Sequence, residues 1–90
     1  MICEHLKAAG DPAPASAYAG GCPECVAGGF SDWVHLRVCL TCGLVACCDS
    51  SPRRHMSAHH DQTGHPVMRS YEPGENWRWC FRDELAWEPA

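Results

Sequence analysis

Two short motifs, Cys22-Pro23-Glu24-Cys25 and Cys39-Leu40-Thr41-Cys42, dominate this sequence. A gap of two residues lets both sulfurs of a tight turn point at one metal ion, while backbone N–H groups soften the thiolate charge. A single CxxC is also typical of redox proteins, but that use needs a thioredoxin-like βαβ context, which this chain lacks. Two such pairs followed by histidines predict structural zinc.

Each CxxC pair needs two further ligands. His55 and His59 lie one turn apart on the same face of a predicted helix, and His65 follows just past its end. Cys47 and Cys48 precede the helix, so the chain can supply one Cys₃His and one Cys₂His₂ set. We expect the two other histidines, His35 and His60, to be packed or solvated side chains.

A third set of ligands lies at the two ends of the chain. It comprises Cys3, His5 and Cys80, with Asp83 as a carboxylate ligand that zinc accepts less often than sulfur or imidazole. Seven of the eight cysteines, four of the six histidines and Asp83 would then fill three tetrahedra. The sequence predicts two zinc ions firmly and a third that depends on Asp83.

Composition agrees with a domain that depends on metal. Ninety residues predict one domain, spanning 1–90, whose small hydrophobic core gives modest stability by itself. No secretory signal or membrane-length apolar stretch is present, so we expect a cytoplasmic, reducing environment in which thiols bind metal. The net charge of −4 argues against nucleic acid as a partner.

Residue patterns along the chain predict an α+β fold, a small twisted antiparallel sheet with one main helix, cross-braced by zinc. Residues 6–21 are rich in Ala, Gly and Pro and are expected to form a loop-rich excursion with a turn of helix near 15–18. Alternation predicts strands over 33–38, 44–47, 66–71 and 77–81. The helix is predicted over 52–62, with Ser51 as its cap and Gly64 as its end.

In order and spacing, these residues resemble the UBP-type zinc finger of ubiquitin-specific proteases, in a bacterial stand-alone form. The motifs that carry the resemblance are Cys3-x-His5, Cys22-x-x-Cys25, Cys39-x-x-Cys42-Gly43, Cys47, His55-x-x-x-His59, Thr63-Gly64-His65-Pro66 and Trp79-Cys80-Phe81. The resemblance implies three sites: Cys22 and Cys25 with Cys47 or Cys48 and His55; Cys39 and Cys42 with His59 and His65; Cys3 and His5 with Cys80 and Asp83.

Two positions need a decision within this resemblance. The spacing from Cys42 favours Cys47 as ligand, whereas the spacing back from His55 favours Cys48; we favour Cys47, because it ends a predicted strand. Family members with three zinc ions carry cysteine at the position of Asp83, so the third site departs from the pattern.

The resemblance also implies a binding function. Family members that bind ubiquitin take its free C-terminal Gly-Gly into a narrow aromatic pocket, in which an arginine after the equivalent of Cys47 holds the carboxylate. Trp79 and Phe81 match pocket aromatics, but Cys48-Asp49-Ser50 replaces the arginine segment, and candidates to substitute are Arg53, Arg54, Arg78 and Arg82. We therefore expect a non-catalytic module for a peptide or protein C-terminal tail, a ubiquitin-like C-terminus being one candidate. Packing in the core is the alternative role for Trp79 and for Trp77, and it is the role that we favour for Phe81.

A metalloenzyme and a nucleic-acid-binding zinc finger are the two alternative functions. A metalloenzyme would use an incompletely ligated Cys3/His5/Cys80 site, but the chain has no HExxH motif and no nucleophile–base pair. A nucleic-acid-binding zinc finger would need a basic face, whereas the predicted helix offers only Arg53 and Arg54 near its start.

Overall fold

A computed structural model describes residues 2–89 and has nine short elements. The helices are α1 (Glu4–Ala8), the 3-10 helix η1 (Tyr18–Gly20), α2 (Pro23–Ala27) and α3 (His55–Thr63). The strands are β1 (Leu36–Cys39), β2 (Val45–Cys47), β3 (Val67–Ser70), β4 (Arg78–Cys80) and β5 (Leu85–Trp87). None of the helices within 2–89 is long and apolar enough to span a bilayer.

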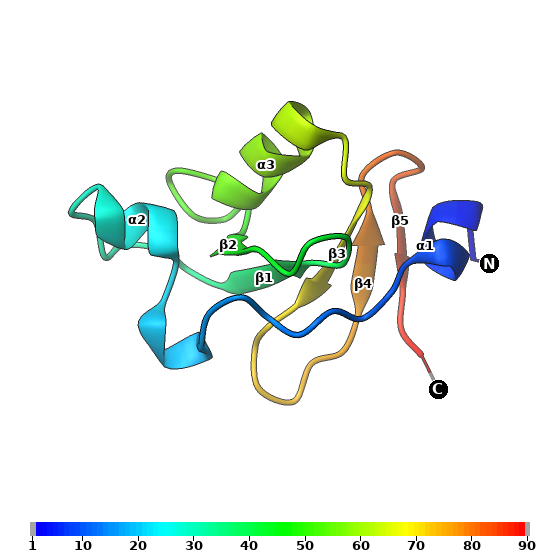
Figure 1. Cartoon of the computed structure of the whole chain (residues 1–90), viewed down its shortest axis with the longest axis horizontal. Coiled ribbons are helices and arrows are strands. Elements are labelled where there is room, and N and C mark those ends of the chain that lie inside the picture. The colour runs from blue at the N-terminus through cyan, green and yellow to red at the C-terminus, as the bar shows by residue number, and fades with distance from the viewer. Residues whose placement is uncertain (1, 90) are drawn as a thin grey trace.

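The five strands form one antiparallel sheet in the order β2-β1-β3-β4-β5, which confirms the predicted α+β class. In Figure 1, α3 lies over one side of the sheet, α2 lies beyond its β2 end, and α1 lies beside β4 and β5. The first helix and the last two strands are therefore neighbours, which brings together the segments that carry the third set of ligands.

The hydrophobic core is divided into three small clusters. The first contains Leu36, Val38 and Val45, the second Leu6, Leu40 and Val67, and the third Ala46 of β2 with Met56 of α3. Each cluster also includes at least one candidate ligand cysteine, such as Cys80 in the second. Cores this small provide little stability alone, so the fold needs cross-links at the same places.

The main helix begins at His55, three residues later than the predicted start at Pro52. The expected cap, Ser51, instead accepts a hydrogen bond at Oγ from the Val34 N–H at 2.8 Å, so it does not cap the helix. Arg54 occupies the N-cap position in the left-handed region, with φ 44°. The C-terminal prediction is right, because Gly64 ends the helix with φ 75°.

The first predicted strand is also shorter than expected at its start. The ladder with β2 ends at the pair Leu36–Cys47, so residues 33–35 lie outside it. Val34, which strict alternation would bury, is exposed, and its N–H is used by Ser51. β5, α1 and α2 were not predicted, because three to five residues carry too little periodicity for a pattern to emerge.

The excursion over residues 6–21 crosses the sheet as an ordered segment. Ala15 N–H donates to the carbonyl oxygen of Gly43 at 2.8 Å, and the Tyr71 hydroxyl donates to the carbonyl oxygen of Ser16 at 3.0 Å. Gly43 has φ 82°, and a Cβ there would lie 2.6 Å from the Ala13 oxygen, so this close approach requires glycine. The predicted turn of helix forms at η1, slightly later than residues 15–18.

Candidate metal centres

Three groups of four potential ligands come together in the part of the chain that the structure describes. They are Cys22, Cys25, Cys47 and His55; Cys39, Cys42, His59 and His65; and Cys3, His5, Cys80 and Asp83. Within each group the ligand atoms all lie within 4.8 Å of one another. Since the first group takes residues on both sides of the Cys39–Cys42 pair, the first two groups interleave along the chain.

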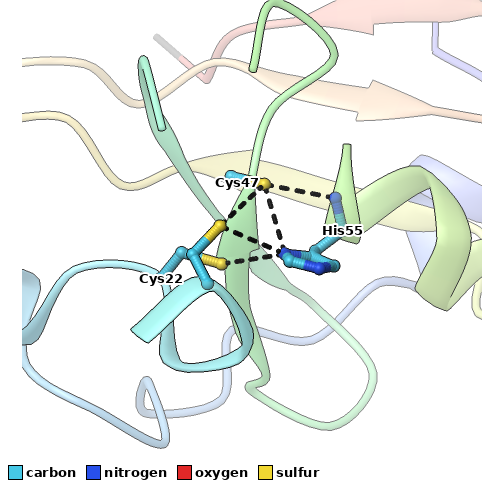
Figure 2. Close-up of side chains that lie close together, drawn as sticks. Cys22, Cys47 and His55 are labelled. Atoms are coloured by element: carbon cyan, nitrogen blue, oxygen red, sulfur yellow. Dashed lines mark hydrogen bonds between the residues drawn. The ribbon is translucent and has the colours of Figure 1, made fainter. Parts of the chain in front are cut away.

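The first group is assembled from four elements. Cys22 is the N-cap of α2, Cys25 lies within α2, Cys47 ends β2 and His55 begins α3. The Nδ1 atom of His55 lies 3.3, 3.4 and 3.5 Å from the sulfurs of Cys22, Cys25 and Cys47, respectively. Figure 2 shows these side chains converging on one point between α2, β2 and α3.

These distances match what zinc requires. Bonds of about 2.3 Å to sulfur and about 2.0–2.1 Å to nitrogen, meeting at tetrahedral angles, separate two sulfurs by about 3.8 Å and a sulfur from a nitrogen by about 3.5 Å. The sulfurs of Cys25 and Cys47 are 3.9 Å apart, close to the first value. The residues present therefore fit a Cys₃His zinc site.

Burial in this group disfavours thiolates that have no neighbouring cation. Cys22, Cys25 and Cys47 are at most 1% exposed. Burial, followed by the neighbouring Cys22 and Cys47, raises the pKa of Cys25 to about 12, and burial also raises the pKa of Cys47. A divalent cation would offset the repulsion among three thiolates, and the backbone N–H of His55, 3.2 Å from Cys47 Sγ, would help to hold the charge.

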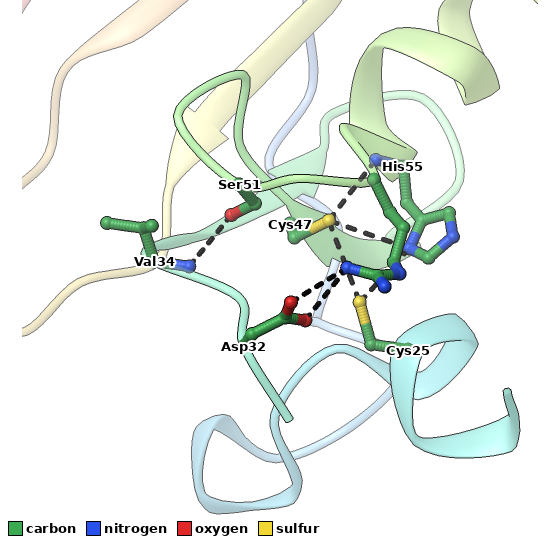
Figure 3. Close-up of polar contacts among 7 residues, drawn as sticks. Cys25, Asp32, Val34, Cys47, Ser51 and His55 are labelled. Carbon is green, nitrogen blue, oxygen red and sulfur yellow. Dashed lines mark hydrogen bonds and ion pairs between the residues drawn. The ribbon is translucent and has the colours of Figure 1, made fainter. Parts of the chain in front are cut away.

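The surroundings of the first group keep its loops in place. Figure 3 shows Cys47 turned toward Cys25 and His55, while Ser51 turns away to bond the Val34 N–H. Arg53 pairs with both carboxylate oxygens of Asp32 at 2.9 Å and lies over the Phe30 ring. These contacts tie the segment before α3 to the loop after α2, which fixes the approach of His55.

The second group links the β1–β2 turn to α3. The sulfur of Cys39 lies 3.4 Å from His65 Nδ1, the sulfur of Cys42 lies 3.5 Å from His59 Nε2, and the two imidazole nitrogens are 3.2 Å apart. A tetrahedral zinc would separate two nitrogens by about 3.4 Å, so this group fits a Cys₂His₂ site. Burial, then His65, lowers the pKa of His59, which favours the neutral ring that binds metal.

His60, which was expected to be packed or solvated, lies beside the second group. Its Nδ1 atom is 2.8 Å from the carbonyl oxygen of His65, and its ring stacks on Phe81 with centroids 4.6 Å apart. Phe81 therefore supports α3 and the His65 backbone, and it packs against the third core cluster.

The third group is more open and differs in geometry. The side chains of His5 and Asp83 are 38% and 40% exposed, and His5 Nδ1 lies 2.7 Å from Asp83 Oδ2, a hydrogen-bond distance. A shared tetrahedral ion would separate these two atoms by about 3.4 Å, although the 3.6 Å between Cys80 Sγ and Asp83 Oδ2 already suits one. The hydrogen bond to His5, above all, lowers the pKa of Asp83, so the carboxylate is ionised and able to act as a ligand.

Cys48 lies outside all three groups, whereas Cys47 belongs to the first. Cys47 pairs with Leu36 and shares its face of the sheet, which is the face of Cys22 and Cys25. The Cys48 side chain points to the opposite face of the sheet, as alternation along a strand requires. Its sulfur lies 3.6 Å from Ser51 Oγ. The structure therefore brings together the set that contains Cys47.

A pocket of about 250 Å³ lies on the opposite face of the sheet from Cys47. Its lining consists of Arg37, Cys48, Asp49, Ser50, Met68, Trp77 and Trp79. Met68 and Trp79 are cross-strand partners, so their side chains stand on the same face. Trp79 thus lines a pocket as the tail-binding interpretation expects, whereas Phe81 is not among the lining residues and stacks on His60 instead.

Arg37 is a pocket residue that sequence reasoning did not single out. It is 8% exposed, and its guanidinium carbon lies 4.5 Å from the centroid of the Trp77 ring. Alternation with the apolar Leu36 and Val38 places Arg37 on the other face of the strand, where an arginine is ordinarily exposed, so the sequence carries no signal of its burial.

Comparison with known proteins agrees with the geometry of the first two groups. The model of the family described as "Zn-finger in ubiquitin-hydrolases and other protein" matches residues 22–88. The solution NMR structure of protein RPA1320 from Rhodopseudomonas palustris is 44% identical, with a TM-score of 0.85, over 98% of this chain and 82% of that one. No curated protein matches this chain.

Proposed function

The chain belongs to the family of zinc fingers found in ubiquitin hydrolases and other proteins, and from this premise we propose that it is a non-catalytic binding module, built on three zinc ions, whose pocket takes the C-terminal tail of a peptide or protein. The family and the cysteine–histidine groups together indicate a zinc-binding module. The number of ions, the absence of catalysis and the ligand are the parts that we propose.

Three zinc ions are supported by the three ligand groups, and the groups differ in strength. The first two offer sulfur and imidazole ligands at tetrahedral spacing, all of them buried or half-buried except the exposed Cys42. The third offers an exposed carboxylate, and it needs His5 Nδ1 and Asp83 Oδ2 to move apart by about 0.7 Å to admit an ion. We therefore expect the third ion to bind most weakly.

A structural role for the metals follows from the number of ligands. Each group provides four protein ligands, which completes a tetrahedron, whereas a catalytic zinc keeps one position for water or substrate. When bound, the ions supply cross-links between α2, β2 and α3, between the β1–β2 turn and α3, and between α1 and the β4–β5 turn. Each link includes at least one cysteine that belongs to a core cluster, so metal and core would stabilise the same parts of the fold.

The pocket beside Trp79 is the observation that carries the binding proposal. Two indole side chains and Met68 give it apolar walls, and Arg37 gives it a positive charge. Its volume of about 250 Å³ is small for a ligand site, so it suits the last one or two residues of a chain with little side chain. Backbone N–H and C=O groups of such a tail would find polar partners in Asp49 and Ser50.

Titration calorimetry with a short peptide ending in Gly-Gly tests this function. We expect saturable binding by the zinc-loaded protein, and no binding when the same Gly-Gly lies in the middle of the peptide. Trp79→Leu should weaken binding at least about tenfold, as expected for an aromatic contact at the centre of a site. Trp87→Leu serves as the control, because Trp87 packs with the second core cluster, away from the pocket. Equal affinity for terminal and internal Gly-Gly would overturn the proposal.

A further inference from the structure

Arg37 is a nearly buried cation without an anionic partner. Nη1 donates to the carbonyl oxygen of Leu36 at 3.1 Å, but Nε is buried and has no hydrogen-bond partner. Within residues 2–89, no carboxylate forms an ion pair with Arg37, whereas Arg53 pairs with Asp32 and Arg69 with Asp11. The guanidinium is instead held against Trp77.

Glu75 is the carboxylate whose charge interacts with that of Arg37. Its side chain already accepts hydrogen bonds from other groups. Glu75 accepts hydrogen bonds from Ser70 Oγ at 2.7 Å and from Trp77 Nε1 at 3.2 Å. The Ser70 bond is the main reason why the pKa of Glu75 is lowered, and the charge of Arg37 contributes less. Glu75 therefore holds Trp77 in place under the guanidinium and leaves the remaining donors of Arg37 available to the pocket.

A buried guanidinium with vacant donors is costly unless an anion completes it. Because Arg37 lines the pocket, that anion has to come from what enters the pocket. The planar fork of a guanidinium matches a carboxylate, which can accept two parallel hydrogen bonds. Asp49 lines the same pocket, and its negative charge repels a dianion such as phosphate more strongly than a monoanionic carboxylate.

We infer that Arg37 is the residue that binds the terminal carboxylate of the tail, an inference that rests on the proposed function. The resemblance implies an arginine after Cys47, where this chain has Cys48-Asp49-Ser50, and the substitutes expected from sequence lie elsewhere. Arg53 is engaged by Asp32, and Arg78 stands on the opposite face of the sheet, next to Asp11. Arg37 reaches the same pocket from β1.

Calorimetry with the Gly-Gly peptide in two forms, with a free carboxylate and with a C-terminal amide, tests this role. Wild type should bind the acid about 10- to 100-fold more tightly than the amide, the range for a buried charge-assisted hydrogen-bonded pair. Arg37→Gln should bind both forms with the affinity that wild type has for the amide. Arg69→Gln, a half-buried strand arginine on the other face, should keep the wild-type preference. Acetylglycine and inorganic phosphate complete the series, and only acetylglycine should compete with the acid peptide.

The outcomes separate the two proposals. If wild type binds acid and amide equally and Arg37→Gln behaves the same, the role of Arg37 is wrong while the tail-binding function stands. If neither peptide binds to wild type, the function itself fails and this inference fails with it. If Arg37→Gln does not fold, NMR of wild type decides: the Arg37 Nε–H resonance should shift on addition of the acid and stay in place with the amide, and an unchanged resonance would overturn the inference.

Discussion

Neighbouring cysteines at the end of β2 should respond very differently to the same substitution. Cys47 Sγ lies 3.9 Å from Cys25 Sγ and 3.5 Å from His55 Nδ1, at the centre of the first ligand group. Cys48 is equally buried, at 3% exposure, but contacts Ser51. Replacing each in turn by alanine therefore removes the same atom from two buried sites, of which only that of Cys47 belongs to a ligand group.

The expected sizes of the two effects are far apart. Structural zinc provides about 10–16 kcal/mol in small zinc-dependent domains at neutral pH, and a whole domain is stable by only about 5–15 kcal/mol. Cys47→Ala should therefore lose the first zinc and its cooperative melt. Cys48→Ala removes a small buried group, costs about 1 kcal/mol, and should lower Tm by about 4–8 °C.

Native mass spectrometry and thermal circular dichroism measure both effects on the same samples. We expect one zinc ion fewer in Cys47→Ala and an unchanged count in Cys48→Ala. A Cys48→Ala protein that loses zinc, beside a Cys47→Ala protein that keeps it, would refute the assignment of the first site. Retention of all zinc by both variants would show that neither cysteine is a ligand.

Three further experiments examine the metals and the charges. A strong chelator should abolish the cooperative melt and the protection of the cysteines from alkylation, and an apo-protein that melts near the holo temperature would contradict a metal-dependent fold. Asp83→Asn should reduce the zinc count by one and release α1, seen as loss of hydrogen-exchange protection at Leu6, while the first two sites stay filled; an unchanged count in native mass spectra would mean that Asp83 is not a ligand. Glu75 has a folded pKa below its ordinary 4.5, chiefly because Ser70 donates to it, so its contribution to stability is present above about pH 4.5 and is lost as the pH falls through the lowered value. Ser70→Ala should raise the Glu75 pKa in a carboxyl NMR titration, and an unmoved pKa would argue against that hydrogen bond.

Local spacing explains why so much of the metal framework was predictable. Cys22 and Cys25 must lie on one turn, as must His55 and His59 on one face of a helix, because covalent geometry places residues so close in sequence at a fixed separation. Runs of alternating residues likewise indicated four of the five strands, whereas β5 is too short to leave a pattern.

Contacts between distant segments decided what spacing left open. Ser51 is a good helix cap by residue type, yet it bonds the Val34 N–H and α3 begins later. Phe81 follows the family pattern for a pocket aromatic, yet it stacks on His60. In both cases a partner far away in sequence offered the better contact, and no local rule can identify that partner.

The sequence by itself determined that this protein is organised around metal, because CxxC pairs and spaced histidines specify zinc chemistry within a turn or two of chain. Only the tertiary structure shows that Cys47, and not Cys48, lies together with Cys22, Cys25 and His55, since this depends on which face of β2 meets α2. It also placed Arg37 in a pocket with Trp77 and Trp79. Chirality and spacing act over a few residues, whereas the choice of face and the burial of a charge are settled when separate strands pair and the sheet closes against its neighbours.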